Sequence, residues 1–137
     1  MKKVFNTISF LMVVFASIAQ TNPVKIVFDI TSKDTLAHQA AFRHVAMMSE
    51  AYPQSSFEVV IYGLALPMVV KGQSSIEKDL AAFAGNKNVS FKACSVTLKR
   101  YNVDKSQLVT GVEVVPDAIM EIVTKQGEGW GYIKEGN

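Results

Sequence analysis

Short strand-like segments recur along the chain, the first of them rich in β-branched residues, and a helix-forming segment separates each from the next. Five of them are typical of strands, at residues 24–30, 57–63, 88–94, 112–115 and 130–133. Strands joined through single helices favour a parallel sheet that helices cover on both faces. The preferred handedness of such crossovers narrows the topology further. The pattern therefore predicts an α/β fold, a three-layer α/β/α sandwich on a five-stranded, mainly parallel sheet.

Several of the intervening helices begin at recognisable residues. Ser74 and Glu77 form a capping-box pattern, and Ser95 is expected to cap a helix over residues 96–101. Pro116 suits the first turn of the last helix. Three apolar side chains are expected to pack that last helix onto the sheet: Ile119, Ile122 and Val123.

The N-terminus has the three parts of a secretory signal peptide. Lys2 and Lys3 precede an apolar run at residues 10–16, and the small residues Ser17 and Ala19 stand two apart behind it. The alternative is an uncleaved anchor, but the uninterrupted apolar run is shorter than the roughly 20 residues that span a bilayer. We expect cleavage near Ala19, a domain over residues 20–137, and a soluble protein exported to the periplasm or secreted.

Composition excludes several classes of function. Lys2 and Lys3 are two of 14 basic residues, and the 12 that remain in the mature chain balance its 12 acidic residues. A neutral chain offers no electrostatic footprint for nucleic acid or a membrane surface. The single Cys excludes an internal disulfide framework and a Cys-rich zinc site. His38 and His44 lie on nearly opposite sides of one helix, so they do not share a metal, and we expect neither metal nor cofactor.

One cysteine stands where parallel sheets collect ligands. Cys94 is placed at the carboxyl end of the third strand and directly before a helix. A helix N-terminus favours thiolate over thiol, and thiolate is the nucleophile of sulfur transfer. The alternative is an inert filler, since free Cys is among the most buried residue types. A lone thiol has no resolving partner in its chain, and in an oxidising compartment a buried or pocketed position is expected.

Other strand ends supply candidate substrate-binding residues. Asp29 and Thr31 follow the first strand, and Tyr62 and Gly63 end the second. If the first and third strands were neighbours, these residues would line a pocket together with Cys94. Each also has an ordinary structural role: a turn cap for Asp29, core packing for Tyr62, and backbone freedom for Gly63.

Five pieces of sequence occur in an order that resembles the DsrE/DsrF-like family: Ala93-Cys94-Ser95-Val96-Thr97-Leu98-Lys99, Leu108, Gly111-Val112, Val114-Val115-Pro116, and Gln126-x-Glu128-Gly129-Trp130-x-Tyr132-Ile133. The strand and turn at residues 59–66 resemble that family too. The resemblance implies a compact α/β/α domain that assembles into homo-oligomers, often trimers or hexamers. In the sulfur-relay members, a cysteine at the position of Cys94 carries persulfide sulfur between partner proteins.

The chain departs from those members in carrying an export signal, whereas the relay partners are cytoplasmic. Two hypotheses follow. In the first, the protein is an exported persulfide carrier or accessory thiol protein, at most a sulfurtransferase-like carrier, that exchanges sulfur with a donor or acceptor protein through Cys94. In the second, it is a non-catalytic homo-oligomeric binding module in which Cys94 is structural. The sequence favours the first narrowly.

Overall fold

A computed structural model describes residues 22–135, so the expected signal peptide lies outside the described residues. The described chain forms one five-stranded sheet in the order β4-β3-β2-β1-β5, and every neighbouring pair is parallel. This confirms the predicted sheet. Strand bounds lie within a few residues of the predicted segments: β1 (Lys25–Ile30), β2 (Ser56–Ile61), β3 (Val89–Cys94), β4 (Val112–Val115) and β5 (Gly131–Glu135).

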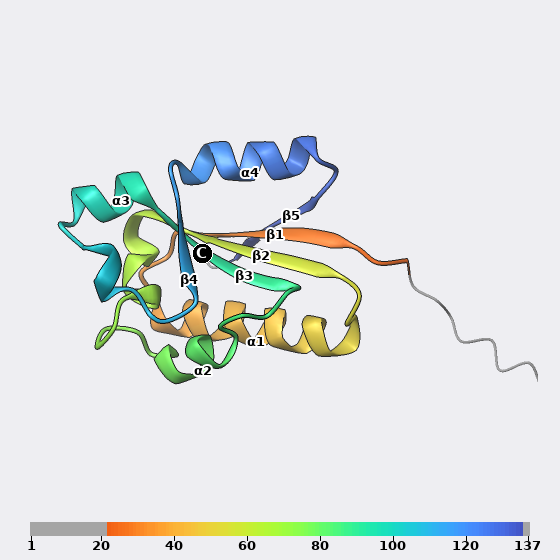
Figure 1. The fold of residues 1–137 in the computed structure, drawn as a ribbon, viewed down its shortest axis with the longest axis horizontal. Coiled ribbons are helices and arrows are strands. Elements are labelled where there is room, and N and C mark those ends of the chain that lie inside the picture. The colour runs from red at the N-terminus through yellow and green to blue at the C-terminus, as the bar shows by residue number, and fades with distance from the viewer. Residues whose placement is uncertain (1–21, 136–137) are drawn as a thin grey trace, which may run out of the picture.

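Helices cover both faces of the sheet, as predicted (Figure 1). The long helix α1 (Thr35–Ala51) and the short α2 (Glu77–Ala82) lie on one face, and α4 (Ala118–Gly127) lies on the other. Three shorter pieces gather near the carboxyl ends of the strands: the 3-10 helix η1 (Gly63–Val69), α3 (Ser95–Arg100) and the 3-10 turn η2 (Lys105–Gln107).

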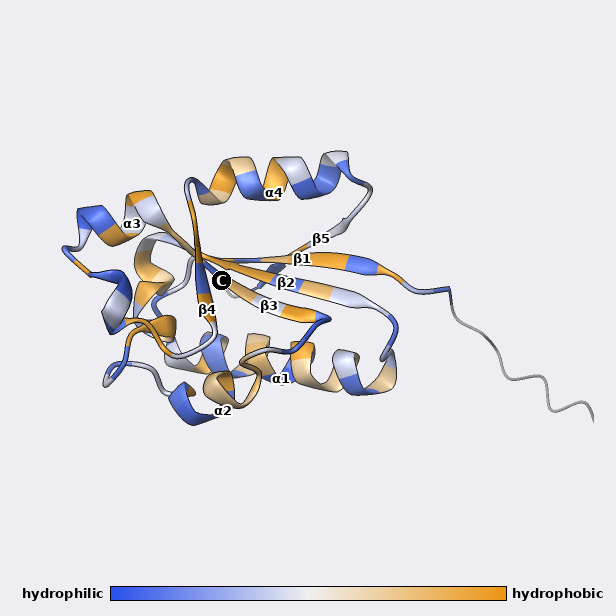
Figure 2. Ribbon diagram, in the orientation of Figure 1, coloured by the Kyte–Doolittle hydropathy of each residue, from blue (hydrophilic) through white to orange (hydrophobic). Residues whose placement is uncertain are grey.

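Alternation of side chains along the strands creates two separate cores. Apolar residues concentrate in the strands of the sheet (Figure 2). The larger core lies on the α1 side, where Phe91 of β3 packs against Phe42 and Phe83 with ring centroids 6.2 Å away. The smaller core lies under α4 and consists of five buried residues: Val27, Val60, Cys94, Ala118 and Ile122.

The helix starts differ from the sequence prediction. Cys94, not Ser95, occupies the N-cap position of α3, and its side chain makes no capping hydrogen bond there. Helix α4 is capped by Asp117, whose carboxylate accepts the N–H groups of Ile119 and Met120, so Pro116 lies before the helix and not in its first turn. An acidic residue is favoured at this position because its carboxylate accepts two N–H groups of the first helical turn that have no partner within the helix.

The capping box expected at α2 is also absent. Ser74 Oγ accepts the N–H of Ile76, and Glu77 Oε2 accepts the N–H of Gly72. Both side chains therefore stabilise the turn before α2, and the helix begins only at Glu77.

The apolar face of α4 is narrower than predicted. Ile122 is buried against the sheet, but Ile119 and Val123 are 61% and 53% exposed. The prediction for these two residues was wrong, because a helix resting on a flat sheet buries a single stripe and this one carries apolar residues on a second side.

No helix in the described part of the chain is both long and apolar enough to cross a bilayer.

Candidate functional site

Strand geometry directs Cys94 to the α4 side of the sheet. Successive side chains of a strand point to opposite faces, so Phe91 and Ala93 enter the larger core and Cys94 enters the smaller one. Its Sγ accepts the backbone N–H of Ala118, the first residue of α4, over 3.4 Å. A helix N-terminal N–H group interacts more strongly with a negative sulfur than with a neutral one. The contact therefore orients Cys94 Sγ toward the start of α4.

A pocket of about 210 Å³ opens beside Cys94. The end of β2 contributes Tyr62 and Gly63 to its wall, and α3 contributes Thr97 and Arg100. The start of α4 contributes a further side of the wall, including Asp117, Ala118 and Ile119. Cys94 itself is only 4% exposed, so the sulfur is buried in the small core yet borders this pocket. The sequence expectation of a buried or pocketed thiol is confirmed.

One positively charged and one negatively charged side chain line the pocket, those of Arg100 and Asp117. The Asp117 carboxylate is engaged by the N–H groups at the start of α4, which partly offset its charge. Arg100 is exposed at the end of α3 and lines the same pocket. A guanidinium attracts and orients anions, so the pocket offers an anionic sulfur species a positive partner near the thiol.

A hydrogen-bonded network lies at the carboxyl ends of β1 and β5. Tyr132 donates its hydroxyl to Asp29 Oδ2 over 2.7 Å, and Lys134 Nζ donates to Asp29 Oδ1 over 3.0 Å. Lys134 also donates to the hydroxyl of Thr31 over 2.6 Å. Because Asp29 stands opposite Lys134 in the β1–β5 register, the parallel pairing itself brings the acid and the base together.

Tyr62 lies between this network and the cysteine. Burial first and the negative charge of Asp29 second together raise the pKa of Tyr62 to about 12, with further contributions from a hydrogen bond with Asp29 and from Tyr132 and Cys94. Lys134 Nζ lies 5.8 Å from the centre of the Tyr62 ring. Tyr62 therefore lines the Cys94 pocket while its hydroxyl belongs to the Asp29 network.

The structure brings only some of the sequence-predicted residues to the cysteine. Tyr62 and Gly63 line the pocket of Cys94. Asp29 and Thr31 do not, because β2 lies between β1 and β3 and the supposed adjacency of the first and third strands was wrong. They form instead the neighbouring network with Lys134, and a role in substrate binding stays a prediction for all four.

Sequence reasoning missed three polar side chains near these residues. Arg100 belongs to no recognisable motif, although its position six residues after Cys94 places both on one short helical segment. Tyr132 and Lys134 were not among the predicted site residues. Their spacing of two along β5 puts them on one face of the sheet, which is a signal that the sequence did carry.

The two histidines have structural roles. His38 is buried, and its Nε2 lies 2.7 Å from the carbonyl oxygen of Ser32. His44 Nδ1 lies 2.7 Å from a carboxylate oxygen of Glu135 on the surface. Within residues 22–135, no group of His, Cys, Asp and Glu is arranged to hold a metal ion.

Comparisons with known proteins place this geometry in context. The model of the DsrE/DsrF-like family matches residues 25–134. The solved structure of MTH1491 from Methanobacterium thermoautotrophicum, a protein of unknown function, is 30% identical with a TM-score of 0.74, covering 81% of this chain and 98% of that one. The ychN protein from E. coli is 15% identical with a TM-score of 0.66, covering 83% and 99%, and shows the same fold. No curated protein matches the sequence.

Proposed function

This chain belongs to the DsrE/DsrF-like family, and we propose that it is an exported protein that carries sulfur as a persulfide on Cys94. The single observation that carries the proposal is the position of the sulfur. Cys94 Sγ borders a pocket and accepts the N–H group at the start of α4, so the same contact that orients the atom also stabilises it as an anion. Export is supported by the charged, apolar and small-residue order of residues 1–19.

The transfer step needs one thiolate and one sulfane-sulfur donor. The Cys94 thiolate attacks the terminal sulfur of a donor persulfide, R–S–SH. The new bond joins Cys94 Sγ to the terminal sulfur, the S–S bond of the donor breaks, and the rest of the donor leaves as the thiolate R–S⁻ while the transferred sulfur keeps its proton. The sulfane sulfur moves from the donor thiolate to the Cys94 thiolate, and the number of thiolates and persulfides does not change. No external oxidant or reductant is therefore consumed. Delivery to an acceptor thiolate is the reverse reaction with a different R.

The surroundings of the sulfur suit a carried persulfide. Cys94 is 4% exposed, which limits capping and over-oxidation in an oxidising compartment. Arg100 lines the pocket and offers a positive partner to the thiolate R–S⁻ that leaves the donor, and Tyr62 adds a polar side chain to the same wall. Gly63 adds no side chain to the wall. Asp29 and Thr31 act one step away by holding Lys134 beside Tyr62.

Assembly with further copies of this chain is part of the proposal, as a trimer or hexamer. Three apolar residues of α4 and one of α3 are exposed, and Val96 and Ile119 among them also line the pocket: Val96, Ile119, Met120 and Val123. Apolar side chains grouped in this way are typical of surfaces that meet a partner. A sulfur donor or acceptor protein would approach the same edge of the sheet.

Intact-protein mass spectrometry tests the carrier function. The protein is incubated with inorganic polysulfide, freed of reagent and weighed. We expect a gain of one sulfur atom that a thiol reductant removes and that Cys94→Ala abolishes. If the native protein gains no sulfur and Cys94 resists alkylation until the chain is unfolded, the cysteine is structural and the alternative of a non-catalytic binding module holds.

A further inference from the structure

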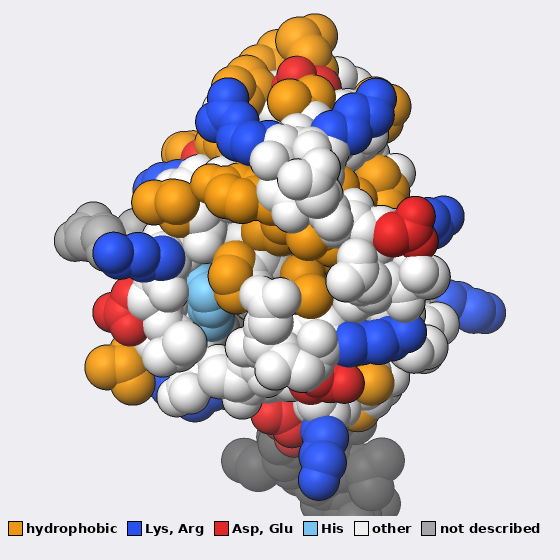
Figure 3. Space-filling model, turned by 90° about the vertical axis from the view of Figure 1, so that its left-hand side faces the viewer, with side chains coloured by type: hydrophobic (Ala, Val, Ile, Leu, Met, Phe, Trp, Pro, Cys, Tyr) orange, Lys and Arg blue, Asp and Glu red, His pale blue; other side chains and the backbone are white. Residues whose placement is uncertain are grey.

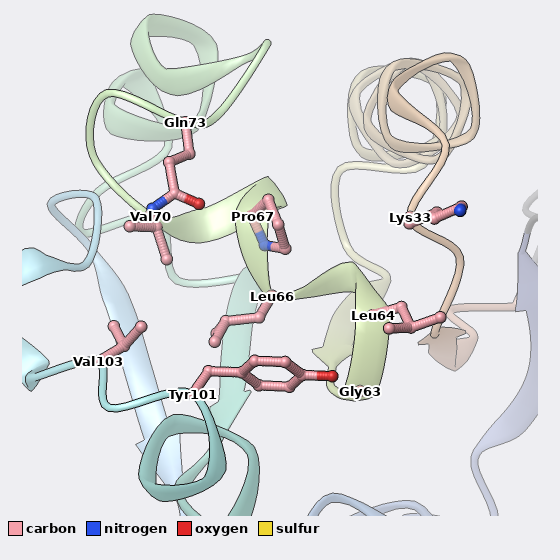
Figure 4. A pocket seen from close by; sticks show the side chains of 9 residues that line it. All are labelled: Lys33, Gly63, Leu64, Leu66, Pro67, Val70, Gln73, Tyr101 and Val103. Atoms are coloured by element: carbon pink, nitrogen blue, oxygen red, sulfur yellow. The ribbon is translucent and has the colours of Figure 1, made fainter.

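A second pocket lies beside the Cys94 pocket, between η1 and the chain that follows α3. Its volume is about 360 Å³, within the size range of small-molecule sites. Figure 4 shows its walls, which carry six apolar side chains: Leu64, Leu66, Pro67, Val70, Tyr101 and Val103. The pocket is therefore suited to an apolar group of several heavy atoms.

The polar residues at this pocket do not favour a charged ligand. Lys33 lies at one end, and its ammonium group points away from the apolar lining (Figure 4). Gln73 supplies one uncharged amide at the other end. Meanwhile Leu64 and Tyr101 are 57% and 44% exposed, so apolar surface remains in water that an occupant would cover.

The two pockets meet at Gly63, which lines both. Gly63 has φ +59° and presents no side chain there, and a Cβ built on it would meet no atom within 4 Å. Its N–H donates to Thr97 Oγ1 over 3.1 Å, and Thr97 belongs to the wall of the Cys94 pocket. The Tyr101 ring extends from α3 toward Gly63 (Figure 4). The boundary between the pockets is thus a backbone segment without a side chain.

Both pockets open at the carboxyl ends of the strands. Figure 3 faces this side of the molecule and shows apolar side chains gathered over its centre and upper part. Gly63 lines both pockets, and Arg100 of the Cys94 pocket is followed directly by Tyr101 of the second pocket, so the two pockets are neighbours. A small thiol compound with an extended apolar body would reach from one into the other.

We infer that the second pocket binds the apolar organic part of the molecule that exchanges sulfur with Cys94. The inference rests on the proposed function and narrows its substrate class. The donor R–S–SH is a low-molecular-weight organic persulfide, and the acceptor is the corresponding thiolate R–S⁻, with an R group that is uncharged and apolar. Such a molecule is preferred over inorganic polysulfide. Its sulfur end lies in the Cys94 pocket, and R passes Gly63 to the lining formed by Leu64 and Tyr101.

Alkyl methanethiosulfonates of increasing chain length test this assignment. Each reagent transfers its S–R group to the Cys94 thiolate, forming a mixed disulfide and releasing methanesulfinate. Second-order rate constants are measured by intact mass for the methyl, pentyl and octyl reagents and divided by their rates with free cysteine. We expect the octyl reagent to gain at least about tenfold over the methyl reagent, as burial of several CH₂ groups provides.

Two variants test whether the faster reaction of the octyl reagent depends on the second pocket. Leu64→Asp and Tyr101→Asp each place a charge in the lining at an exposed position, and both should return the octyl-to-methyl ratio to about one. Leu36→Asp changes a leucine of α1 that is 69% exposed and lines neither pocket, so it should keep the full ratio.

The results of this series distinguish failure of the inference about the second pocket from failure of the proposed carrier function. A flat chain-length series with a brisk methyl reaction would overturn the inference and leave the carrier function intact. A ratio that survives both Asp substitutions would place R elsewhere and would also overturn it. If Cys94 of the native protein reacts with none of the reagents, both the inference and the proposed carrier function are overturned.

Discussion

The backbone N–H of Ala118 donates to Cys94 Sγ over 3.4 Å, although the two residues are 24 positions apart in the sequence. The contact joins the end of β3 to the beginning of α4. Since an N–H donor interacts more strongly with a charged acceptor, it should increase the population of nucleophilic sulfur.

Replacing Ala118 with Pro removes this donor without opposing the helix start. Pro is favoured at the first helical position, and Asp117 already has the extended backbone (φ −147°, ψ 124°) that a following Pro requires. We expect the alkylation rate of Cys94 by iodoacetamide at neutral pH to fall about tenfold, the effect of one hydrogen bond to a charged group. Ala118→Ser keeps the N–H and should react nearly as the wild type. Equal rates in the two variants would show that this N–H does not hold the thiolate.

Arg100 should select for anionic reagents at the pocket. In Arg100→Ala, we expect the reaction of Cys94 with iodoacetate to slow about threefold while that with neutral iodoacetamide stays constant, as a partly screened charge contributes under 1 kcal/mol. Lys99→Ala removes the preceding cation, which does not line the pocket, and should leave both rates unchanged. A parallel loss with both reagents in Arg100→Ala would indicate a structural effect and no electrostatic selection.

Glu58 should make the protein less stable above neutral pH. Burial and, to a smaller extent, the nearby Glu121 carboxyl raise the pKa of Glu58 from 4.5 to about 7, with Lys125 opposing the shift. Its Oε1 is buried with no hydrogen-bond partner among the described residues. Between these two pKa values the folded state holds a proton that the unfolded state has released, so the stabilisation is complete below about pH 4.5 and is lost as the pH rises through about 7.

Urea unfolding at several pH values measures this contribution. The wild type should lose roughly 2 kcal/mol more than Glu58→Gln between about pH 5 and pH 8, because the Gln side chain does not ionise. Glu113→Gln changes an exposed carboxylate on β4 and should follow the wild-type profile. Parallel profiles for the wild type and Glu58→Gln would contradict the assignment.

The exposed side of α4 should be covered in the assembled protein. Met120 is 60% exposed there, and Met47 on α1 is 66% exposed on the opposite face of the sheet. We expect Met120→Glu to shift the sedimentation coefficient to that of a monomer, since a buried unpaired charge is costly, while Met47→Glu leaves it unchanged. A monomeric wild type, or a Met120→Glu variant that remains assembled, would contradict an interface at this face.

The strands could be predicted because each carries its signal locally. Cys94 was placed correctly at the end of the third strand, since helix-forming residues follow it directly. The pocket around that cysteine was only partly predictable. Tyr132 and Lys134 reach Asp29 through the pairing of β5 with β1, which joins residues more than 100 positions apart. Such a pairing depends on the sheet order, and local patterns do not encode it.

The error at α4 has a different physical cause. Hydropathy identified Ile119, Ile122 and Val123 alike as buried residues, but only Ile122 faces the sheet. The hydropathy of a residue type is the same whether the side chain packs within its own chain or remains exposed. The sequence therefore identifies apolar positions correctly and does not say which of them the domain itself covers.

Strand β3 has side chains on both faces of the sheet, so substitutions that change the stability of the protein lie on one face and those that change the reactivity of Cys94 lie on the other. Variants of Phe91 or Ala93 alter the core against α1, whereas variants facing α4 alter the surroundings of the sulfur. A mutant library for thermal resistance is best confined to the first group, and one for altered reactivity to the second. Deleting one residue within β3 would exchange the two groups and turn the thiol into the aromatic interior, out of reach of any reagent.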